Sequence, residues 1–302
     1  MAFDAESINR LRETTWIRTT VYREVVGSTN DLALRHACDD ALELPVLVLA
    51  DRQTTGRGRG ANRWWSPAGA LAFSILLATT DHACERGEGG AESYPVGAAV
   101  DRMTPGGAGG QSSADSDHRP PPVPMFSSAP GLVSLATGLA VCEALQQLQP
   151  ALPVGLKWPN DVLVSDRKIA GILVEKPPNR PDRIVLGIGI NVNNSLHEAP
   201  DRLARLATSL IDEAHYSFPL MEVLTRVLWQ LREQLCQLAS DRSQLVPRWQ
   251  TLCVLTDKQV QVNAGTHVRA GLCRGIDADG ALILDTPEGR QHCGSGRVTR
   301  YA

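Results

Sequence analysis

Residues 51–66 read DRQTTGRGRGANRWWS, and the rest of the chain is organised around them. Within this stretch, glycines alternate with arginines between residues 56 and 60. The apolar runs at 45–50 and 70–78 are short and bounded by turn-forming residues, which predicts two buried strands joined by a loop. Glycines let a backbone turn its N–H groups toward a ligand, and guanidinium groups bind carboxylates or phosphates bidentately. The stretch therefore predicts an anion-binding loop, with a solvated surface loop as the alternative.

Upstream of the loop, the pattern predicts helix, strand and helix. Residues 4–13 have the spacing of a short amphipathic helix, and residues 18–26 alternate like a strand rich in β-branched side chains. Ser28 then precedes a helical run that reaches about Cys38, with Asp31 at capping-box spacing. Ser28 is thus predicted to be an N-cap, although a hydroxyl at a strand-to-helix junction also lies where open sheets bind small molecules.

Downstream of the loop, residues 154–175 predict three strands joined by two tight turns. Lys157 lies in the first of these apolar strands, just before a Pro-Asn-Asp turn. Burying an unpaired ammonium group is costly, and an anionic ligand would offset that cost. A lysine that reaches solvent from an edge strand is the alternative.

Residues 184–191 predict a strand with two different faces. Its isoleucine and leucine side chains share one face, and Gly187, Gly189 and Asn191 share the other. Glycine inside a strand often marks the close approach of a ligand or of another backbone. The glycine face is therefore predicted to be largely bare and to receive either a ligand or a packed helix.

The remaining pattern predicts scaffold. Apolar residues at helical spacing over 132–145 and 217–240 predict two core helices. From residue 258 onward, short β-rich runs alternate with turns, which predicts a small all-β domain at residues 253–302 after a first domain at residues 1–252.

Residues 81–130 differ in composition from the rest of the first domain. They contain 8 Gly, 7 Pro and 6 Ser, and neither Leu nor Ile. Such a stretch buries too little apolar surface to offset the entropy of ordering. It is predicted to be a low-complexity, mostly disordered insertion with no motif of its own.

Composition sets broad limits on function. The chain has 302 residues, of which 43% are apolar and 21% charged, and a net charge of -3, so any cationic site must be local and bulk nucleic-acid binding is not indicated. The seven cysteines are scattered without a C-x-x-C pair, which is typical of reduced cytosolic thiols. No signal-peptide core and no uncharged apolar run approaching 18 residues is present, so a cytoplasmic protein without a membrane span is expected.

The absence of their motifs argues against several classes of catalytic site. The sequence has no G-x-S-x-G elbow, no H-E-x-x-H, no G-x-x-x-x-G-K-[ST], and no Cys or His cluster at metal spacing. The remaining features are the arginine-glycine loop, Lys157 and the glycine face of residues 184–191. Together they indicate a site that binds an anion beside an apolar group.

Five motifs, taken in order, resemble those of biotin protein ligases. They are STN at 28–30, QxxGRGRGxNxWxSP at 53–67, KWPND at 157–161, KIAGILVE at 168–175 and GIGIN at 187–191. The similarity covers about residues 21–194 apart from the insertion, and the small β-domain matches the C-terminal domain of that family in position and size. The resemblance implies an α+β fold with a mixed central sheet flanked by helices, as in class II aminoacyl-tRNA synthetases and biotin-lipoate ligases, followed by a small SH3-like β-barrel domain.

The resemblance also implies a two-step reaction. Biotin and ATP, aided by Mg²⁺, give biotinyl-5'-AMP and pyrophosphate, and biotin then passes to a lysine of a biotin carboxyl carrier protein domain. Attack of a carboxylate on the α-phosphate concentrates negative charge, so positioning and electrostatic stabilisation supply most of the catalysis. The Mg²⁺ ligands and the identity of the carrier stay open, and a homodimer is left open as well.

The roles of individual residues are carried over from the same resemblance. Lys157, Arg57 and Arg59 are the catalytic candidates, and Lys157 is expected to bridge the biotin carboxylate and the α-phosphate. The residues expected to bind biotin are Ser28, Thr29, Asn30, Gln53, Arg57, Gly58, Arg59, Lys157, Gly171, Gly187 and Gly189. Trp64, Lys168 and Asn191 are expected near the nucleotide, with Trp64 covering the intermediate.

This sequence departs from the pattern of the family in two places. Ala61-Asn62 stands where many members have Gly-Arg, so Asn62 receives no charge-based role. Only 27 residues precede Ser28, too few for the DNA-binding domain of bifunctional repressor-ligases, so the monofunctional form without DNA binding is expected.

Two rival functions share parts of this pattern. Lipoate and octanoate ligases have the same fold, but they lack support from the Gly-Arg loop and the Lys-Trp-Pro-Asn-Asp turn. A non-catalytic regulator that binds biotin or biotinyl-AMP is the other rival, and the presence of Lys157 argues against it. A biotin-dependent pyrophosphate-exchange assay separates the three.

Overall fold

The structure is a computed structural model that describes residues 3–79, 123, 129–265 and 267–301. Its larger sheet has the strand order β1-β2-β3-β7-β6-β5-β4. The strands are β1 (Thr19–Val26), β2 (Val46–Gln53), β3 (Ala70–Ala78), β4 (Val154–Lys157), β5 (Asp161–Val164), β6 (Arg167–Glu175) and β7 (Arg183–Asn191). Only β1 and β2 pair in parallel, and every other pairing in the sheet is antiparallel, so the predicted mixed sheet is confirmed.

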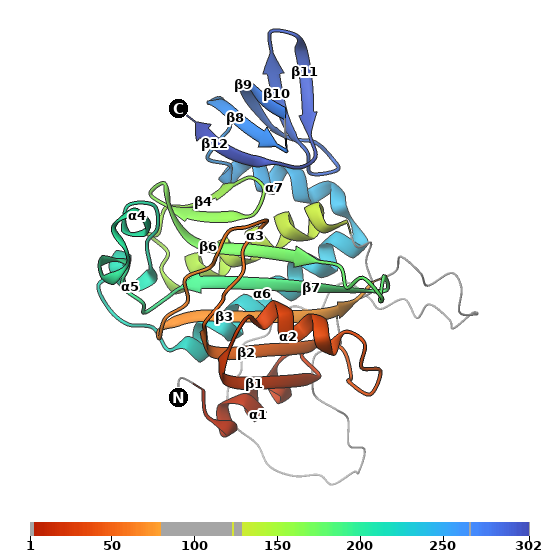
Figure 1. Cartoon of the computed structure of the whole chain (residues 1–302), viewed down its shortest axis with the longest axis vertical. Helices are drawn as coiled ribbons and strands as arrows, with labels where there is room; N and C mark the ends of the chain where they lie inside the picture. The colour runs from red at the N-terminus through yellow and green to blue at the C-terminus, as the bar shows by residue number, and fades with distance from the viewer. Residues whose placement is uncertain (1–2, 80–122, 124–128, 266, 302) are drawn as a thin grey trace, which may run out of the picture.

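Helices cover both faces of this sheet (Figure 1). The helices are α1 (Ala5–Thr14), α2 (Thr29–His36), α3 (Pro130–Leu148), α4 (Asp201–Ala204), α5 (Leu210–Ala214), α6 (Leu220–Ser240) and α7 (Leu245–Leu252), with 3-10 turns at Leu196–Glu198 and Arg242–Gln244. α3 packs against α6 and the sheet on one face, whereas α2 packs on β2, β3 and β7 from the other. The predicted helices at 4–13, 132–145 and 217–240 are thereby confirmed.

The two faces of the sheet follow from alternation along each strand. In β2, Leu47 and Leu49 belong to the main core with α3 and α6, while Val46 and Val48 join a smaller core under α2. The isoleucines of β7 lie in the main core, as predicted, and all nine of its residues are buried. The glycine face of β7 is therefore covered in this structure.

α3 is long and apolar enough to cross a membrane by length and composition alone. In this fold 72% of that window is buried, because the helix packs between α6 and the sheet. Its composition is that of a core helix.

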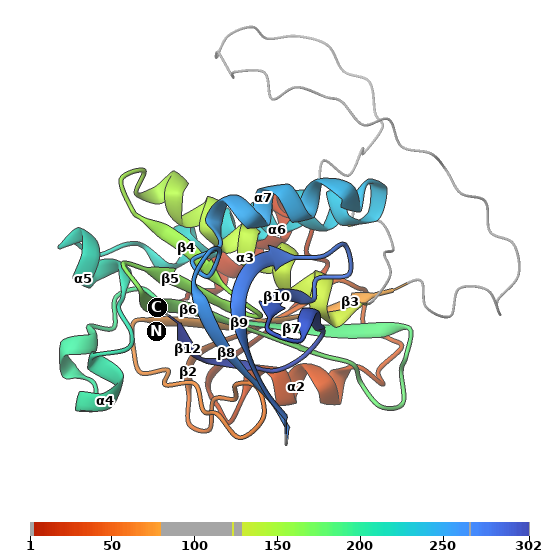
Figure 2. The same ribbon diagram turned by 90° about the horizontal axis from the view of Figure 1, so that it is seen from above.

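A second, smaller sheet follows α7 and has the order β11-β10-β9-β8-β12. Its strands are β8 (Gln259–Ala264), β9 (His267–Ile276), β10 (Leu282–Thr286), β11 (Gly289–Cys293) and β12 (Arg297–Tyr301), all paired antiparallel. This confirms the small all-β unit with SH3-like architecture. Figure 1 shows this sheet above the larger one, and in Figure 2, seen from above, it lies in front of the larger sheet.

The predicted insertion at 81–130 falls almost entirely outside the described residues. Of its positions, the structure describes Val123, Ala129 and Pro130. Pro130 is the first residue of α3 and Ala129 is its N-cap, so the helix begins inside the predicted insertion.

Candidate functional site

A row of residues in register crosses the α2 face of the larger sheet. Lys157 of β4 pairs with Asp161 of β5, which pairs with Gly171 of β6. Gly171 pairs in turn with Gly189 of β7, and Gly189 with Ala72 of β3. Residues opposite one another in a sheet share a face, so two charged groups stand at one end of a floor made of small residues. Residues distant in sequence thus form one surface.

Trp64 covers this floor. A Cβ added to Gly189 would stand 2.4 Å from Cε2 of the indole, and one added to Gly171 would stand 3.3 Å from Cζ3. The Trp64 Nε1 is buried and has no hydrogen-bond partner among the described residues. The glycines of β6 and β7 therefore provide room for a flat group, which here is the indole of Trp64.

Gly187 lies in the next position of the same face and is covered differently. A Cβ there would stand 2.0 Å from Oδ1 of Asn30 in α2. Of the two uses predicted for the glycine face, close packing of a helix is the one seen at this position.

The loop between β2 and β3 folds as a short hairpin. Trp64 N donates to Gly56 O at 2.9 Å, and Gly58 N donates to Asn62 O at 2.9 Å. Gly60, at the tip, has φ +61°, a left-handed conformation that glycine adopts without strain. The side chain of Asn62 donates to Arg59 O at 2.8 Å, so it closes the turn and needs no charge to do so.

The two arginines of the loop point to different partners. Arg57 forms ion pairs with Asp31 of α2 at 2.5 Å and with Glu175 of β6 at 2.6 Å. Burial alone would lower the pKa of Arg57, but its hydrogen bonds to Glu175 and Asp31 raise it overall. Arg57 therefore ties the loop to both α2 and β6.

Arg59 reaches the smaller sheet instead. Its Nη1 donates to Gly296 O at 3.0 Å. Burial lowers the pKa of Arg59, and the nearby negative charge of Asp161 partly opposes that shift. Arg59 therefore ties the loop to the segment just before β12.

Lys157 and Lys168 stand on either side of Asp161. Lys168 Nζ pairs with Asp161 Oδ1 at 2.5 Å and lies 5.6 Å from the centre of the Trp64 ring. The side chain of Lys157 makes no ion pair or hydrogen bond within the described residues, and its Nζ lies 4.9 Å from the centre of the Tyr301 ring. Burial is the main cause that lowers the pKa of Lys157. The lysine predicted from an apolar strand is thus half-buried and lacks a carboxylate partner.

The junction between β1 and α2 forms a buried polar network. Ser28 is the N-cap of α2 and accepts from Asp31 N, as predicted. Gln53 Oε1 accepts from Thr29 N at 2.7 Å and from Thr29 Oγ1 at 3.1 Å. Ser74 of β3 then donates to Thr29 Oγ1 at 2.9 Å and to Asn30 Oδ1 at 2.6 Å. The structure thus brings the residues predicted for the biotin head group into one cluster.

Sequence reasoning missed Ser74, Asp31, Glu175, Asp161 and Tyr301 as members of the site. Ser74 could have been suspected because it is the one hydroxyl within the apolar run 70–78. Tyr301 gave no such signal, since its contact to Lys157 depends on how the two sheets are docked.

Asn191, at the end of β7, has its side chain in a structural contact. Its Nδ2 donates to Thr208 O at 2.9 Å, and its Oδ1 accepts from Asn194 at 3.1 Å. Thr208 N donates in turn to Lys168 O. The predicted contact of Asn191 with a nucleotide remains a prediction, and the network connects it to the backbone of Lys168.

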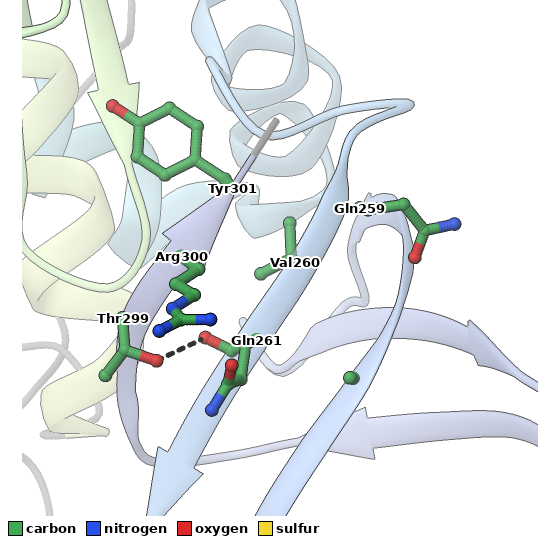
Figure 3. Close-up of a pocket in the computed structure, with 7 residues that line it drawn as sticks. Gln259, Val260, Gln261, Thr299, Arg300 and Tyr301 are labelled. Atoms are coloured by element: carbon green, nitrogen blue, oxygen red, sulfur yellow. Dashed lines mark hydrogen bonds between the residues drawn. The ribbon is translucent and has the colours of Figure 1, made fainter.

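An open groove of about 550 Å³ lies on the smaller sheet, lined by residues of β8, β9 and β12. Figure 3 shows Arg300 and Thr299 pointing toward Gln261, with Tyr301 pointing away from them. Among the residues that line the groove, Tyr301 is the one whose ring also contacts Lys157. The groove and the glycine floor are therefore separate surfaces.

No group of three or more His, Cys, Asp or Glu side chains that could hold a metal ion occurs among the described residues. Mg²⁺ in nucleotide sites is usually held by phosphates and by one or two carboxylates, and Asp161 and Asp166 are the carboxylates near Lys157. These residues do not form a protein cage for the ion.

Comparison with known protein families gives matches in both the first part of the chain and its C-terminal part. A model of the Biotin/lipoate A/B protein ligase family matches residues 22–87 and 122–191, and a model of the Biotin protein ligase C terminal domain matches residues 252–300. The biotin–[acetyl-CoA-carboxylase] ligase of Mycobacterium tuberculosis is 32% identical over 264 residues, which are 86% of this chain and 80% of that protein. The bifunctional ligase/repressor BirA of Bacillus subtilis is 28% identical, over 89% of this chain and 70% of its own length.

Among solved structures, the biotin protein ligase of Aquifex aeolicus in complex with biotin and ATP superposes with a TM-score of 0.71. It is 25% identical, and the match covers 95% of this chain and all of that one. The matched segments contain the loop, the row of small residues and both sheets. This chain belongs to the biotin protein ligase family.

Proposed function

We propose that this chain activates biotin with ATP to biotinyl-5'-AMP and then transfers biotin to a lysine of a biotin carboxyl carrier protein domain. The observation that carries the proposal is the excess of positive charge at one end of the glycine floor. Lys168 pairs with the carboxylate of Asp161, Lys157 stands opposite Asp161 in the β4–β5 ladder, and the negative charge of Asp161 raises the pKa of Arg59 against the effect of burial. Such a site suits a ligand with an apolar body and a polyanionic end, as biotinyl-AMP and its precursors have.

The proposed division of roles follows the geometry. The cluster of Ser28, Thr29, Gln53 and Ser74 offers hydroxyl and amide groups for the ureido ring of biotin. The row formed by Gly171, Gly189 and Ala72 receives its fused rings. Because Trp64 fills that space here, its indole has to move before a ring can lie there, and the hairpin that carries it is the segment that would open.

In the first step, the carboxylate of biotin attacks the α-phosphate of ATP and pyrophosphate leaves. Lys157 provides an ammonium group that no protein carboxylate neutralises within the described residues, so it can stabilise the charge that develops on the phosphate. Arg59 and Lys168 would orient the phosphates from the two sides. Mg²⁺, when bound, would neutralise phosphate charge, and none of the roles given to this chain depends on it.

In the second step, a lysine amine of the carrier attacks the acyl carbon of biotinyl-AMP and AMP leaves. The hairpin of residues 56–64 then serves to exclude water, because a mixed anhydride hydrolyses when it is wetted. Arg57, through Asp31 and Glu175, would hold the base of this hairpin.

The carrier would be a domain of a biotin-dependent carboxylase, and the proposed location is the cytoplasm. The free state of the described cysteines agrees with a reducing compartment.

The test is exchange of labelled pyrophosphate into ATP. Exchange that requires biotin, and that lipoate or octanoate does not support, is the expected result, followed by mass-spectrometric detection of one biotin on a carrier domain. Exchange driven by lipoate or octanoate would instead assign the chain to the other ligases of this fold. Tight biotin binding without any exchange would make it a regulator.

A further inference from the structure

The last strand of the smaller sheet, β12, brings this sheet into contact with Arg59 and Lys157. β12 is an edge strand that pairs with β8 alone, and it runs next to the larger sheet (Figure 1). Gly296, just before β12, accepts from Arg59 of the hairpin at 3.0 Å. Tyr301, at the end of β12, contacts Lys157 of β4. Both ends of this strand therefore touch candidate catalytic residues of the first domain.

The position of the Tyr301 ring is determined from several sides. Its centre lies 4.9 Å from Lys157 Nζ and 5.1 Å from Lys258 Nζ. Its hydroxyl donates to Asp166 Oδ1 at 3.5 Å, in the turn between β5 and β6. The ring also packs against the hydrophobic core. These contacts place the ring firmly beside the ammonium group.

An aromatic partner has a specific advantage for this lysine. A carboxylate would hold the ammonium group equally well, but it would neutralise the charge and compete with an incoming phosphate. The face of an aromatic ring attracts a cation through its quadrupole and leaves the net charge in place. The nearest carboxylate in the row, Asp161, is already paired with Lys168 at 2.5 Å.

We propose that Tyr301 is a positioning residue for Lys157, so that the smaller sheet completes the active site by holding the ammonium group where the α-phosphate reacts. This inference rests on the proposed function, because it assigns Lys157 to adenylate formation. It gives the C-terminal sheet a role in the first chemical step that is independent of any contact with the carrier.

The experiment compares Tyr301→Phe, Tyr301→Leu and Thr299→Val in the full chain. Phe keeps the ring, and Leu keeps much of the apolar volume but removes the ring. Thr299 lies on the same strand, where its hydroxyl donates to Gln261 O at 3.3 Å (Figure 3). In pyrophosphate exchange, Tyr301→Leu should lower kcat by about tenfold with the KM for biotin little changed, which corresponds to ~1.4 kcal/mol in the activation barrier. Tyr301→Phe and Thr299→Val should stay within about twofold of the parent.

A second measurement does not depend on activity. Acetic anhydride labels accessible amines, and mass spectrometry gives the rate at Lys157 itself. We expect this rate to rise several-fold in Tyr301→Leu and to stay near the parent value in Tyr301→Phe. Thermal unfolding checks that each variant is folded.

The outcomes separate the two proposals. An active parent whose kcat and labelling rate are unaffected by Tyr301→Leu overturns the positioning role. Equal losses in Tyr301→Leu and Tyr301→Phe would also overturn it, since the ring would then not be the relevant group. A parent without biotin-dependent exchange refutes the proposed function, whereas the labelling rates still show whether the ring shields Lys157.

Discussion

Lys157 combines burial with the lack of a carboxylate partner, and at the scale of the residue this makes it the most informative position to change. Lys157→Ala should reduce adenylate formation by about 10²–10³-fold, the usual effect of removing one group that stabilises developing charge. Biotin binding should fall much less, because the ammonium group acts chiefly in the transition state. Pyrophosphate exchange and calorimetric titration with biotin measure the two effects.

Lys157→Arg provides the control for charge. Burial lowers the pKa of Lys157, with Lys168 and Arg297 acting in the same direction and Asp161 and Asp166 opposing it. If the cation is required, the parent rate should decline with rising pH below 10.5, the ordinary lysine value. An active Lys157→Arg variant should lack that decline, since arginine stays charged. Unchanged turnover of Lys157→Ala with saturating ATP and biotin would exclude the catalytic role.

Substitution of Gly189 tests whether the indole of Trp64 packs directly on this glycine. A Cβ at this position would meet the rigid indole at 2.4 Å, so Gly189→Ala should displace Trp64 and destabilise the fold by about 1–3 kcal/mol. Gly131→Ala is the matched control, because nothing lies within 4 Å of its Cβ. Denaturant unfolding gives the free energies. Equal stability of the two variants would mean that Trp64 does not rest on Gly189 in solution.

At the scale of the element, the hairpin of residues 56–64 is the part that has to move. Gly58→Ala should be accommodated with a small shift, because the new Cβ would stand 3.3 Å from Asn62 Cβ. It should nevertheless restrict the backbone and let biotinyl-AMP escape several-fold faster, while biotin affinity changes only modestly. The measurement is the dissociation rate of biotinyl-AMP, beside a titration with biotin alone.

Two results would contradict this account of the hairpin. An equal loss of biotin binding and of adenylate retention would make the hairpin a static wall of the pocket. Parent-like retention would leave its glycines as turn residues, a role that the φ of +61° at Gly60 already shows for one of them.

Sequence patterns predicted the elements better than the contacts between them. Periodicity located the helices and strands, since alternation along β7 and the apolar stripe of α6 are local properties. The partners of Arg57 were not predictable, because Glu175 is 118 residues away and reaches it only after the sheet has formed. The same holds for Ser74, which joins Thr29 and Asn30 across 44 or 45 residues.

At the scale of the whole molecule, sequence reasoning did not predict the contacts between the two sheets. Trp158, next to Lys157, donates from Nε1 to Gly280 O at 3.0 Å, and Val254 N donates to Leu156 O at 3.0 Å. A motif read as part of the first domain thus also binds the second sheet. Residues of both sheets belong to one hydrophobic core, so changes in the smaller sheet should affect the site.

The chain between β3 and α3 contains most of the predicted insertion. Composition alone predicted that residues 81–130 are a mostly disordered insertion, but Val123 packs against the main core. The family match itself breaks between residues 87 and 122. Replacing residues 88–121 by a short Gly/Ser linker should therefore leave pyrophosphate exchange within about twofold of the parent, because the entropic cost of closing a flexible segment grows only slowly with its length.

Comparing replacements that keep or remove Val123 tests whether this residue stabilises the fold. The same replacement extended over Val123 should lower the melting temperature by a few degrees more than the shorter one, because about 1 kcal/mol of apolar contact is lost. Carrier biotinylation is measured in parallel with exchange. If the shorter replacement keeps exchange but loses transfer to the carrier, residues 88–121 take part in docking the carrier. If it lowers the melting temperature as much as the longer one does, the replaced residues themselves contribute to the stability of the fold.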